Sequence, residues 1–153
     1  MHILRIIPNY KAKQLLLSYY FKGIDENHFK QIANDFSLKQ IDNIVRPQAM
    51  ARIRWHKESG HKVVVVSASM ECWLKAWCEK NNLELIGTKL KFHENVFTGQ
   101  LATNNWYGQE KVNRIRNSYD LDDFSYIYAY GDSEGDREML AIANENYFKV
   151  FWY

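Results

Sequence analysis

The sequence predicts an α/β protein with a Rossmann-like parallel sheet, preceded by a helical segment that stays outside the sheet. From Val63 to the C-terminus, apolar runs typical of strands alternate with helical patterns, which is typical of an open, doubly wound sheet. Residues 1–46, in contrast, carry helical patterns only. We therefore expect two parts, a helical segment at residues 1–46 and an α/β core at residues 47–153.

Three helices are expected before the first strand. Gly23 would end the first helix, and Asp25 is placed to cap the second. Pro47 stands at the first position of a third helix that would end at Gly60. The first helix has four apolar residues spaced for one face, namely Leu15, Leu16, Tyr19 and Tyr20. The second helix has an apolar stripe of Phe29, Ile32, Ala33 and Phe36.

The core begins with the valine run 63–66, which predicts a strand buried on both faces, as in a parallel sheet. Helices and strands are expected to alternate after it. They are a helix at 71–81, a strand at 83–90, a hairpin at 92–101, a helix at 107–119, a strand at 126–130, a helix at 135–143 and a final strand at 147–152.

Composition excludes several classes of partner. The net charge of +2 is too small to indicate a nucleic acid or an anionic membrane. The apolar stretch at the start is far shorter than the roughly 18 residues of a membrane span, and no signal cleavage site follows it. Cys72 and Cys78 lie six residues apart without zinc-ligand spacing, and we expect reduced thiols. We therefore expect a cytoplasmic location.

The first candidate site is the end of the valine run, at Ser67, Ala68 and Ser69. Ligands of open α/β sheets bind beyond the carboxyl ends of strands. A serine hydroxyl there, together with free backbone N–H groups at the start of a helix, can hold a phosphate oxygen. The alternative interpretation is that these serines only cap the next helix.

The second candidate is the segment from Tyr130 to Asp136, where an apolar strand leads into Asp132 and Asp136 across a glycine turn. Carboxylates are ligands that Mg²⁺ prefers, together with water and substrate phosphate. The alternative is that Asp132 caps a helix and Asp136 is solvated. A third candidate, Lys111, begins a helix, where a lone lysine is usually a surface charge, and it gains meaning only through the other two candidates.

Together these segments resemble the last three of the four motifs of the haloacid dehalogenase superfamily, in the branch of phosphoserine phosphatase. The motifs are Ser67-Ala68-Ser69, then Asn105-Trp106-Tyr107-Gly108 leading to Lys111, and Gly131-Asp132 leading to Asp136. The resemblance implies a Mg²⁺-dependent phosphomonoester hydrolase that acts on a small phosphorylated metabolite. Phosphoserine is one candidate substrate.

The resemblance also implies a role for each residue. Ser67 would hydrogen-bond the transferring phosphoryl group with the backbone N–H of Ala68 or Ser69. Lys111 would neutralise the phosphoryl charge. Asp132 would ligate Mg²⁺, and Asp136 would support the metal site. These roles suit phosphoryl transfer, which depends on positioning and charge stabilisation.

The superfamily's first motif, an apolar strand ending in Asp-x-Asp-x-Thr, does not occur in the 153 residues. Its first aspartate would be the nucleophile that forms an aspartyl-phosphate. The pair Asp120 and Asp122 follows a helix rather than a strand, and we interpret it as a polar turn. We therefore expect residues 1–46 to be the remnant of a helical cap, and the chain alone to be inactive.

That first strand is central in the superfamily, between the strands that correspond here to 63–66 and 126–130. Without it, unpaired backbone groups would each cost about 1 to 3 kcal/mol. We expect the neighbouring strands to close up, another chain to donate a strand or, least favoured because of Arg5 and Pro8, the segment 3–7 to move in. Two non-enzymatic alternatives follow, a phosphate- and magnesium-binding module and a strand-exchanging homo-oligomer.

Overall fold

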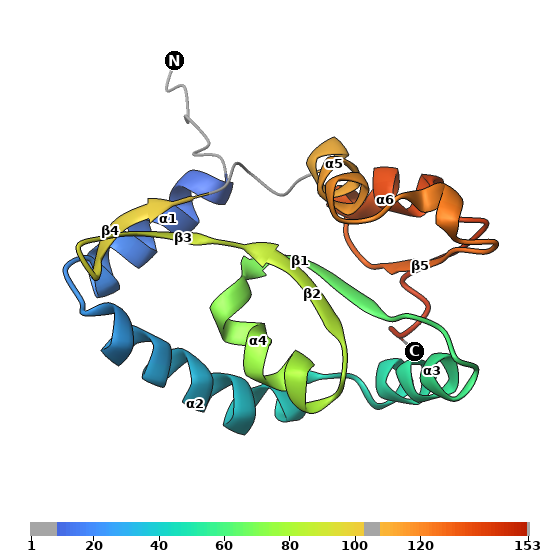
Figure 1. The fold of residues 1–153 in the computed structure, drawn as a ribbon, viewed down its shortest axis with the longest axis horizontal. Coiled ribbons are helices and arrows are strands. Elements are labelled where there is room, and N and C mark those ends of the chain that lie inside the picture. The colour runs from blue at the N-terminus through green and yellow to red at the C-terminus, as the bar shows by residue number, and fades with distance from the viewer. Residues whose placement is uncertain (1–8, 103–107, 153) are drawn as a thin grey trace, which may run out of the picture.

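The computed structural model describes residues 9–102 and 108–152. Helices α1 (Asn9–Phe21), α2 (Glu26–Ile44) and α3 (Pro47–Glu58) come first. Strands and helices then follow in alternation, as the sequence predicts, and the α/β class is confirmed (Figure 1). None of the helices in the described residues is both long and apolar enough to cross a bilayer.

The helix boundaries largely follow the local signals in the sequence. Asp25 caps α2 by accepting hydrogen bonds from the backbone N–H groups of Asn27 and His28, at 2.9 and 3.1 Å. Pro47 is the first residue of α3. Helix α2 continues past the expected stripe to Ile44, because Ser37 and Ile41 are buried against α4 and extend its inward face.

The apolar face that the spacing identifies on α1 is exposed in the structure, and another side of the helix is buried. Leu15 and Tyr19 are 61% and 83% exposed, whereas Leu17 is 7% exposed. Helix α1 packs on β4 (Val96–Leu101) with Ser18 against Gly99, whose φ of +81° suits glycine. A Cβ at Gly99 would lie 2.5 Å from Ser18 Oγ, so this close approach decides which face of the helix turns inward.

Two parallel strand pairs form the core of the fold. Strand β1 (Val64–Met70) pairs with β2 (Glu84–Thr88), and helix α4 (Glu71–Lys80) connects them. Strand β5 (Tyr128–Gly131) pairs with β6 (Glu145–Phe148), with the 3₁₀ turn η2 (Glu134–Asp136) and α6 (Arg137–Ala141) between them.

The two pairs are not hydrogen-bonded to each other, and among the described residues β1 and β5 each have one partner strand (Figure 1). The valine run was predicted to be a strand buried on both faces, and this was wrong: the residues of β1 are half-buried except for Ser69, which is exposed. The last strand begins at Glu145 and ends at Phe148, earlier than the expected 147–152, because its register with β5 sets its limits.

The remaining elements agree with the expected order. Strand β3 (Leu90–His93) and β4 form an antiparallel hairpin, whose end pairs with the start of α2 through Asp25 and Val96. Helix α5 is Gln109–Ser118, and the 3₁₀ turn η1 (Leu121–Asp123) follows it. The expected polar turn is confirmed there, with Asp120 accepting a hydrogen bond from the N–H of Asp122 at 3.1 Å.

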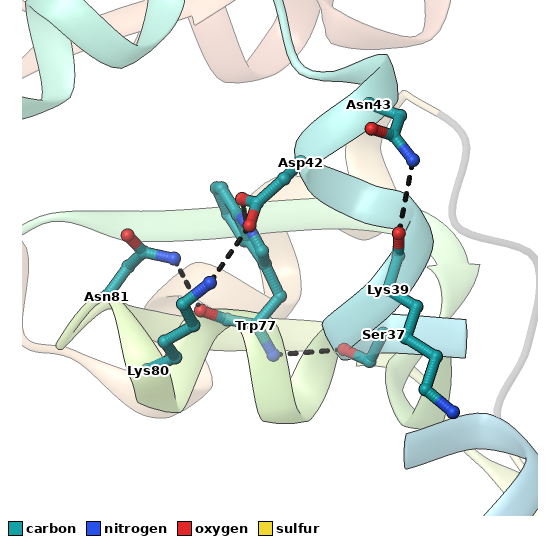
Figure 2. Close-up of polar contacts among 7 residues, drawn as sticks. All are labelled: Ser37, Lys39, Asp42, Asn43, Trp77, Lys80 and Asn81. Atoms are coloured by element: carbon teal, nitrogen blue, oxygen red, sulfur yellow. Dashed lines mark hydrogen bonds and ion pairs between the residues drawn. The ribbon is translucent and has the colours of Figure 1, made fainter. Parts of the chain in front are cut away.

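An apolar cluster lies where α2 and α4 pack together, with buried residues Ile41, Trp77, Cys78 and Leu83. Two hydrogen bonds join α2 to α4 beside this cluster (Figure 2). Ser37 Oγ accepts a hydrogen bond from the backbone N–H of Trp77 at 2.9 Å, and the Asp42 carboxylate accepts one from Trp77 Nε1 at 2.6 Å. Both cysteines are free, as expected, and burial raises the pKa of each thiol to about 11. Thiols of this kind are unreactive.

Candidate functional site

The turn that follows β5 is built around the carboxylate of Asp136. Its Oδ2 accepts three hydrogen bonds, from the backbone N–H of Asp132 at 3.1 Å, the backbone N–H of Ser133 at 2.9 Å and Ser133 Oγ at 2.7 Å. Gly131 permits this packing, since a Cβ there would lie 2.6 Å from the Cβ of Asp136. Asp136 thus fixes the backbone that presents Asp132 at the strand end.

Lys111 reaches the other oxygen of the same carboxylate. Its Nζ donates to Asp136 Oδ1, and the two residues are only 6% and 5% exposed. The start of α5 is held next to η2 because the N–H of Gly108 donates to the carbonyl of Gly135 at 3.2 Å. Lys111 is therefore a buried, paired cation and not a surface charge.

The pKa of Asp136 is set by opposing effects. Burial, the largest of them, would raise the pKa of this carboxyl, but the hydrogen bonds from Lys111 and Ser133 outweigh it and hold the pKa below its usual value. A carboxylate with this many donors stays ionised. The Asp136 carboxyl is therefore ionised at neutral pH.

The magnesium site expected from Asp132 and Asp136 is incomplete in the described residues. Asp132 is exposed, whereas both oxygens of Asp136 are already bonded within the protein. No group of three or more His, Cys, Asp or Glu side chains suited to a metal ion occurs in the part of the chain that the structure describes. Since Mg²⁺ is held by several oxygen ligands, these residues do not make a full site by themselves.

Ser67, Ala68 and Ser69 lie in the irregular end of β1, where the register with β2 shifts between Val66 and Met70. Ser67 Oγ accepts a hydrogen bond from the N–H of Ser69 at 3.0 Å, and the Ala68 carbonyl accepts from Thr88 Oγ1 at 3.1 Å. The alternative interpretation, helix capping, does not describe these serines, because the N-cap of α4 is Met70 and no side chain caps it.

The structure thus brings Lys111, Asp132 and Asp136 together. No hydrogen bond or ion pair among the described residues joins Ser67 to Lys111 or Asp136, and that Ser67 belongs to the same site stays a prediction. The Asn105–Tyr107 part of the second motif lies outside the described residues.

Two residues that hold these segments in place were not identified from the sequence. They are Ser133, in the turn after β5, and Thr88, which contacts the end of β1. Ser133 completes a capping box with Asp136, and its position three residues before a carboxylate is a local signal that could have identified it. The contact of Thr88 with Ala68 spans 20 residues, and no local pattern indicates it.

Comparisons with known proteins agree with this architecture. The model of the family described as haloacid dehalogenase-like hydrolase matches residues 2–141. Protein CicA of Caulobacter vibrioides is 32% identical over 143 residues, which are 92% of this chain and 64% of that protein. The chain therefore spans less than two thirds of this curated relative.

Solved structures show the same fold at low sequence identity. A protein of unknown function from Bordetella pertussis superposes with a TM-score of 0.79 at 19% identity, covering 92% of this chain and 65% of that one. A probable phosphoserine phosphatase from Vibrio cholerae superposes with a TM-score of 0.69 at 18% identity, covering 93% of this chain and 42% of that one. At this identity the likeness concerns the fold.

Proposed function

Since this chain belongs to the haloacid dehalogenase-like hydrolase family, we propose that it provides the phosphate- and magnesium-binding part of a phosphomonoester hydrolase similar to phosphoserine phosphatase. The observation that carries the proposal is the buried ion pair of Lys111 and Asp136, whose carboxylate also accepts a hydrogen bond from the backbone of the exposed Asp132. Burying a charged pair is costly. A role in binding phosphate and a metal ion at this strand end would explain why the pair is buried there. The substrate is a small phosphorylated metabolite in the cytoplasm.

In this proposal each side chain has one task. Ser67 donates a hydrogen bond from its hydroxyl to a phosphoryl oxygen. The hydroxyl hydrogen is available for this because Ser67 Oγ acts as the acceptor in its bond with the Ser69 N–H. The backbone N–H of Ala68 assists, since that of Ser69 already donates to Ser67 Oγ. Lys111 neutralises the charge of the phosphoryl group, and Asp136 holds Lys111 and the turn in position. Positioned charges of this kind are the main source of catalysis in phosphoryl transfer.

Magnesium would bind at Asp132, together with water and an oxygen of the substrate phosphate. When bound, the ion would offset the negative charge of the substrate phosphate. Asp136 contributes indirectly, since its oxygens are bonded to Lys111 and to the turn.

The chain by itself would not turn over substrate, because its 153 residues contain no strand ending in Asp-x-Asp-x-Thr that could supply the aspartate nucleophile. The test combines turnover and binding. We expect no hydrolysis of p-nitrophenyl phosphate in the presence of Mg²⁺, and orthophosphate binding, followed by calorimetry, that Lys111→Met abolishes. Lys75→Met, which changes an exposed lysine on α4, is the matched control and should bind as the parent chain does.

Two outcomes contradict the proposal in different ways. Hydrolysis that Asp132→Asn abolishes would show that the chain is active alone. Failure of orthophosphate to bind, or equal binding by Lys111→Met, would remove the phosphate site. Circular dichroism of each variant would separate lost binding from lost folding.

A second candidate function, strand exchange between copies of the chain, is favoured by one observation. Among the described residues β1 pairs only with β2, and β5 only with β6. An unpaired strand edge is a template for a strand from another chain. Light scattering over a range of protein concentrations should then show a dimer, and a monomer at all concentrations would contradict this role.

A further inference from the structure

A cavity of about 250 Å³ lies between α2, α4 and the end of β1. Helix α2 contributes three residues to it, α4 two and β1 one. They are Phe36, Ile41, Ile44, Ser69, Trp73 and Leu74. Ile44 is 69% exposed and Phe36 39% exposed, whereas Ile41 is 3% exposed, so the cavity runs from an open rim to a buried floor. This volume suits one ring or a short branched chain rather than a large ligand.

The lining is mostly apolar. Its polar side-chain groups are the hydroxyl of Ser69 and the indole N–H of Trp73, and none of the six side chains is ionisable. The ammonium and carboxylate groups of an amino acid would lose their hydration here without gaining a charged partner, which is costly. An aromatic or branched aliphatic group would lose little and would contact Trp73 and Phe36, whose rings lie 5.2 Å apart in an edge-on arrangement.

Ser69 connects this cavity to the end of β1 that we propose as the phosphate site. Its backbone N–H donates to Ser67 Oγ at 3.0 Å, and the residue itself lines the cavity. A phosphoryl group bound at Ser67 would therefore have its ester oxygen next to the cavity. We infer that the substrate is the phosphomonoester of an apolar, ring-sized alcohol, whose apolar part occupies the space between α2 and α4. This inference rests on the proposed phosphate site.

The test uses phosphonates, which resist hydrolysis, so that binding can be measured whether or not the chain turns over substrate. The probes are benzylphosphonate, methylphosphonate and the phosphoserine analogue 2-amino-4-phosphonobutyrate, with orthophosphate as the reference, all measured by calorimetry with Mg²⁺ present. We expect benzylphosphonate to bind about tenfold or more tightly than the other three, the discrimination that a small apolar pocket achieves.

Substitutions in the lining test whether the preference for benzylphosphonate arises from this cavity. Phe36→Ser and Ile44→Ser should each reduce the preference for benzylphosphonate and leave orthophosphate binding unchanged. Leu38→Ser is the matched control, since Leu38 is 41% exposed on the same helix and does not line the cavity. Because Ile44 is well exposed, its variant keeps the test valid even if Phe36→Ser unfolds the chain.

The outcomes separate the two proposals. If orthophosphate binds but benzylphosphonate binds no tighter than methylphosphonate, or the amino-acid analogue binds tightest, the inference about the substrate is overturned and the phosphate site stands. If none of the four probes binds, both are overturned. A preference for benzylphosphonate that Ile44→Ser leaves intact would also overturn the inference, since the ring would then bind elsewhere.

Discussion

The strand pair β1–β2 and the strand pair β5–β6 have the same plan, two parallel strands joined through a helix, but they bury different groups. The first buries Trp77, Cys78 and Leu83 with Ile41 of α2. The second buries a few apolar side chains beside one ion pair, Lys111 with Asp136. Burial of apolar surface depends little on charge state, whereas a buried ion pair is stable only while both members remain charged. The two halves of the molecule should therefore respond differently to substitution and to pH.

Polar and aromatic side chains also connect helix α3 to the β5–β6 pair. His56 of α3 lies 3.0 Å from Tyr130 Oη through its Nε2 and 2.9 Å from His61 Nδ1 through its Nδ1. Arg52 lies over the ring of Tyr130, with 5.8 Å between its Cζ and the ring centroid. Trp55 packs edge-on against Tyr128 with 6.0 Å between ring centroids. A buried histidine, a residue type whose charge can change with pH, therefore connects the β5–β6 pair to the rest of the chain.

The largest effect is expected from breaking the ion pair. Lys111→Met leaves the Asp136 carboxylate buried without its cation, which should lower the free energy of unfolding by about 4 kcal/mol. Urea unfolding followed by circular dichroism measures this. The double variant Lys111→Met/Asp136→Asn removes both charges and should recover part of the loss, while Lys75→Met should change stability by less than about 0.5 kcal/mol. A single variant as stable as the parent would show that the pair contributes nothing to the β5–β6 half.

A smaller effect is expected in the apolar half. Ile41→Ala removes side-chain volume from the cluster at the α2–α4 interface and should cost about 3 kcal/mol. The loss should be the same at low and high salt, since no charge changes. Leu38→Ala, an exposed position on the same helix, provides the control. A strong salt dependence of the Ile41→Ala loss would contradict the distinction between the halves.

Local signals in the sequence predicted where helices begin better than they predicted which side chains pack together. The cap at Asp25 and the start at Pro47 depend on adjacent residues, and both were confirmed. The spacing of apolar residues in α1 did not indicate which face turns inward, because the close approach of Ser18 to Gly99 joins positions 81 residues apart (99 − 18). Periodicity identifies a face but not the surface that it meets.

The candidate site was predicted only in part for the same reason. The order of the motifs brought Lys111 and the acidic turn into one hypothesis, and the structure places Lys111 and Asp136 in contact. The contact of His56 with Tyr130 spans 74 residues and has no local signature. Whether Ser67 belongs with Lys111 stays a prediction, because their relation depends on how the two strand pairs come together.

The contact at His56 gives the smallest and most specific effect, a dependence of stability on pH. Burial is the main cause that lowers the pKa of His56, the positive charges of His61 and Arg52 add to it, and Glu145 opposes them. In the unfolded chain the pKa would be about 6.5, so below that pH the unfolded state binds more protons than the folded state. The free energy of unfolding should therefore be level above about pH 6.5 and should fall as the pH drops towards the lowered pKa.

Substitution by phenylalanine tests this dependence. His56→Phe retains a ring against Tyr128 and Tyr130 but cannot bind a proton, so the loss of stability between pH 7.5 and pH 5.5 should shrink in urea unfolding. His93→Phe is the matched control, because its side chain is 79% exposed in the β3–β4 hairpin and far from this contact along the chain. It should leave the pH dependence as in the parent. If His56→Phe lost as much stability on acidification as the parent does, other groups would be responsible, and the junction would not distinguish the two halves.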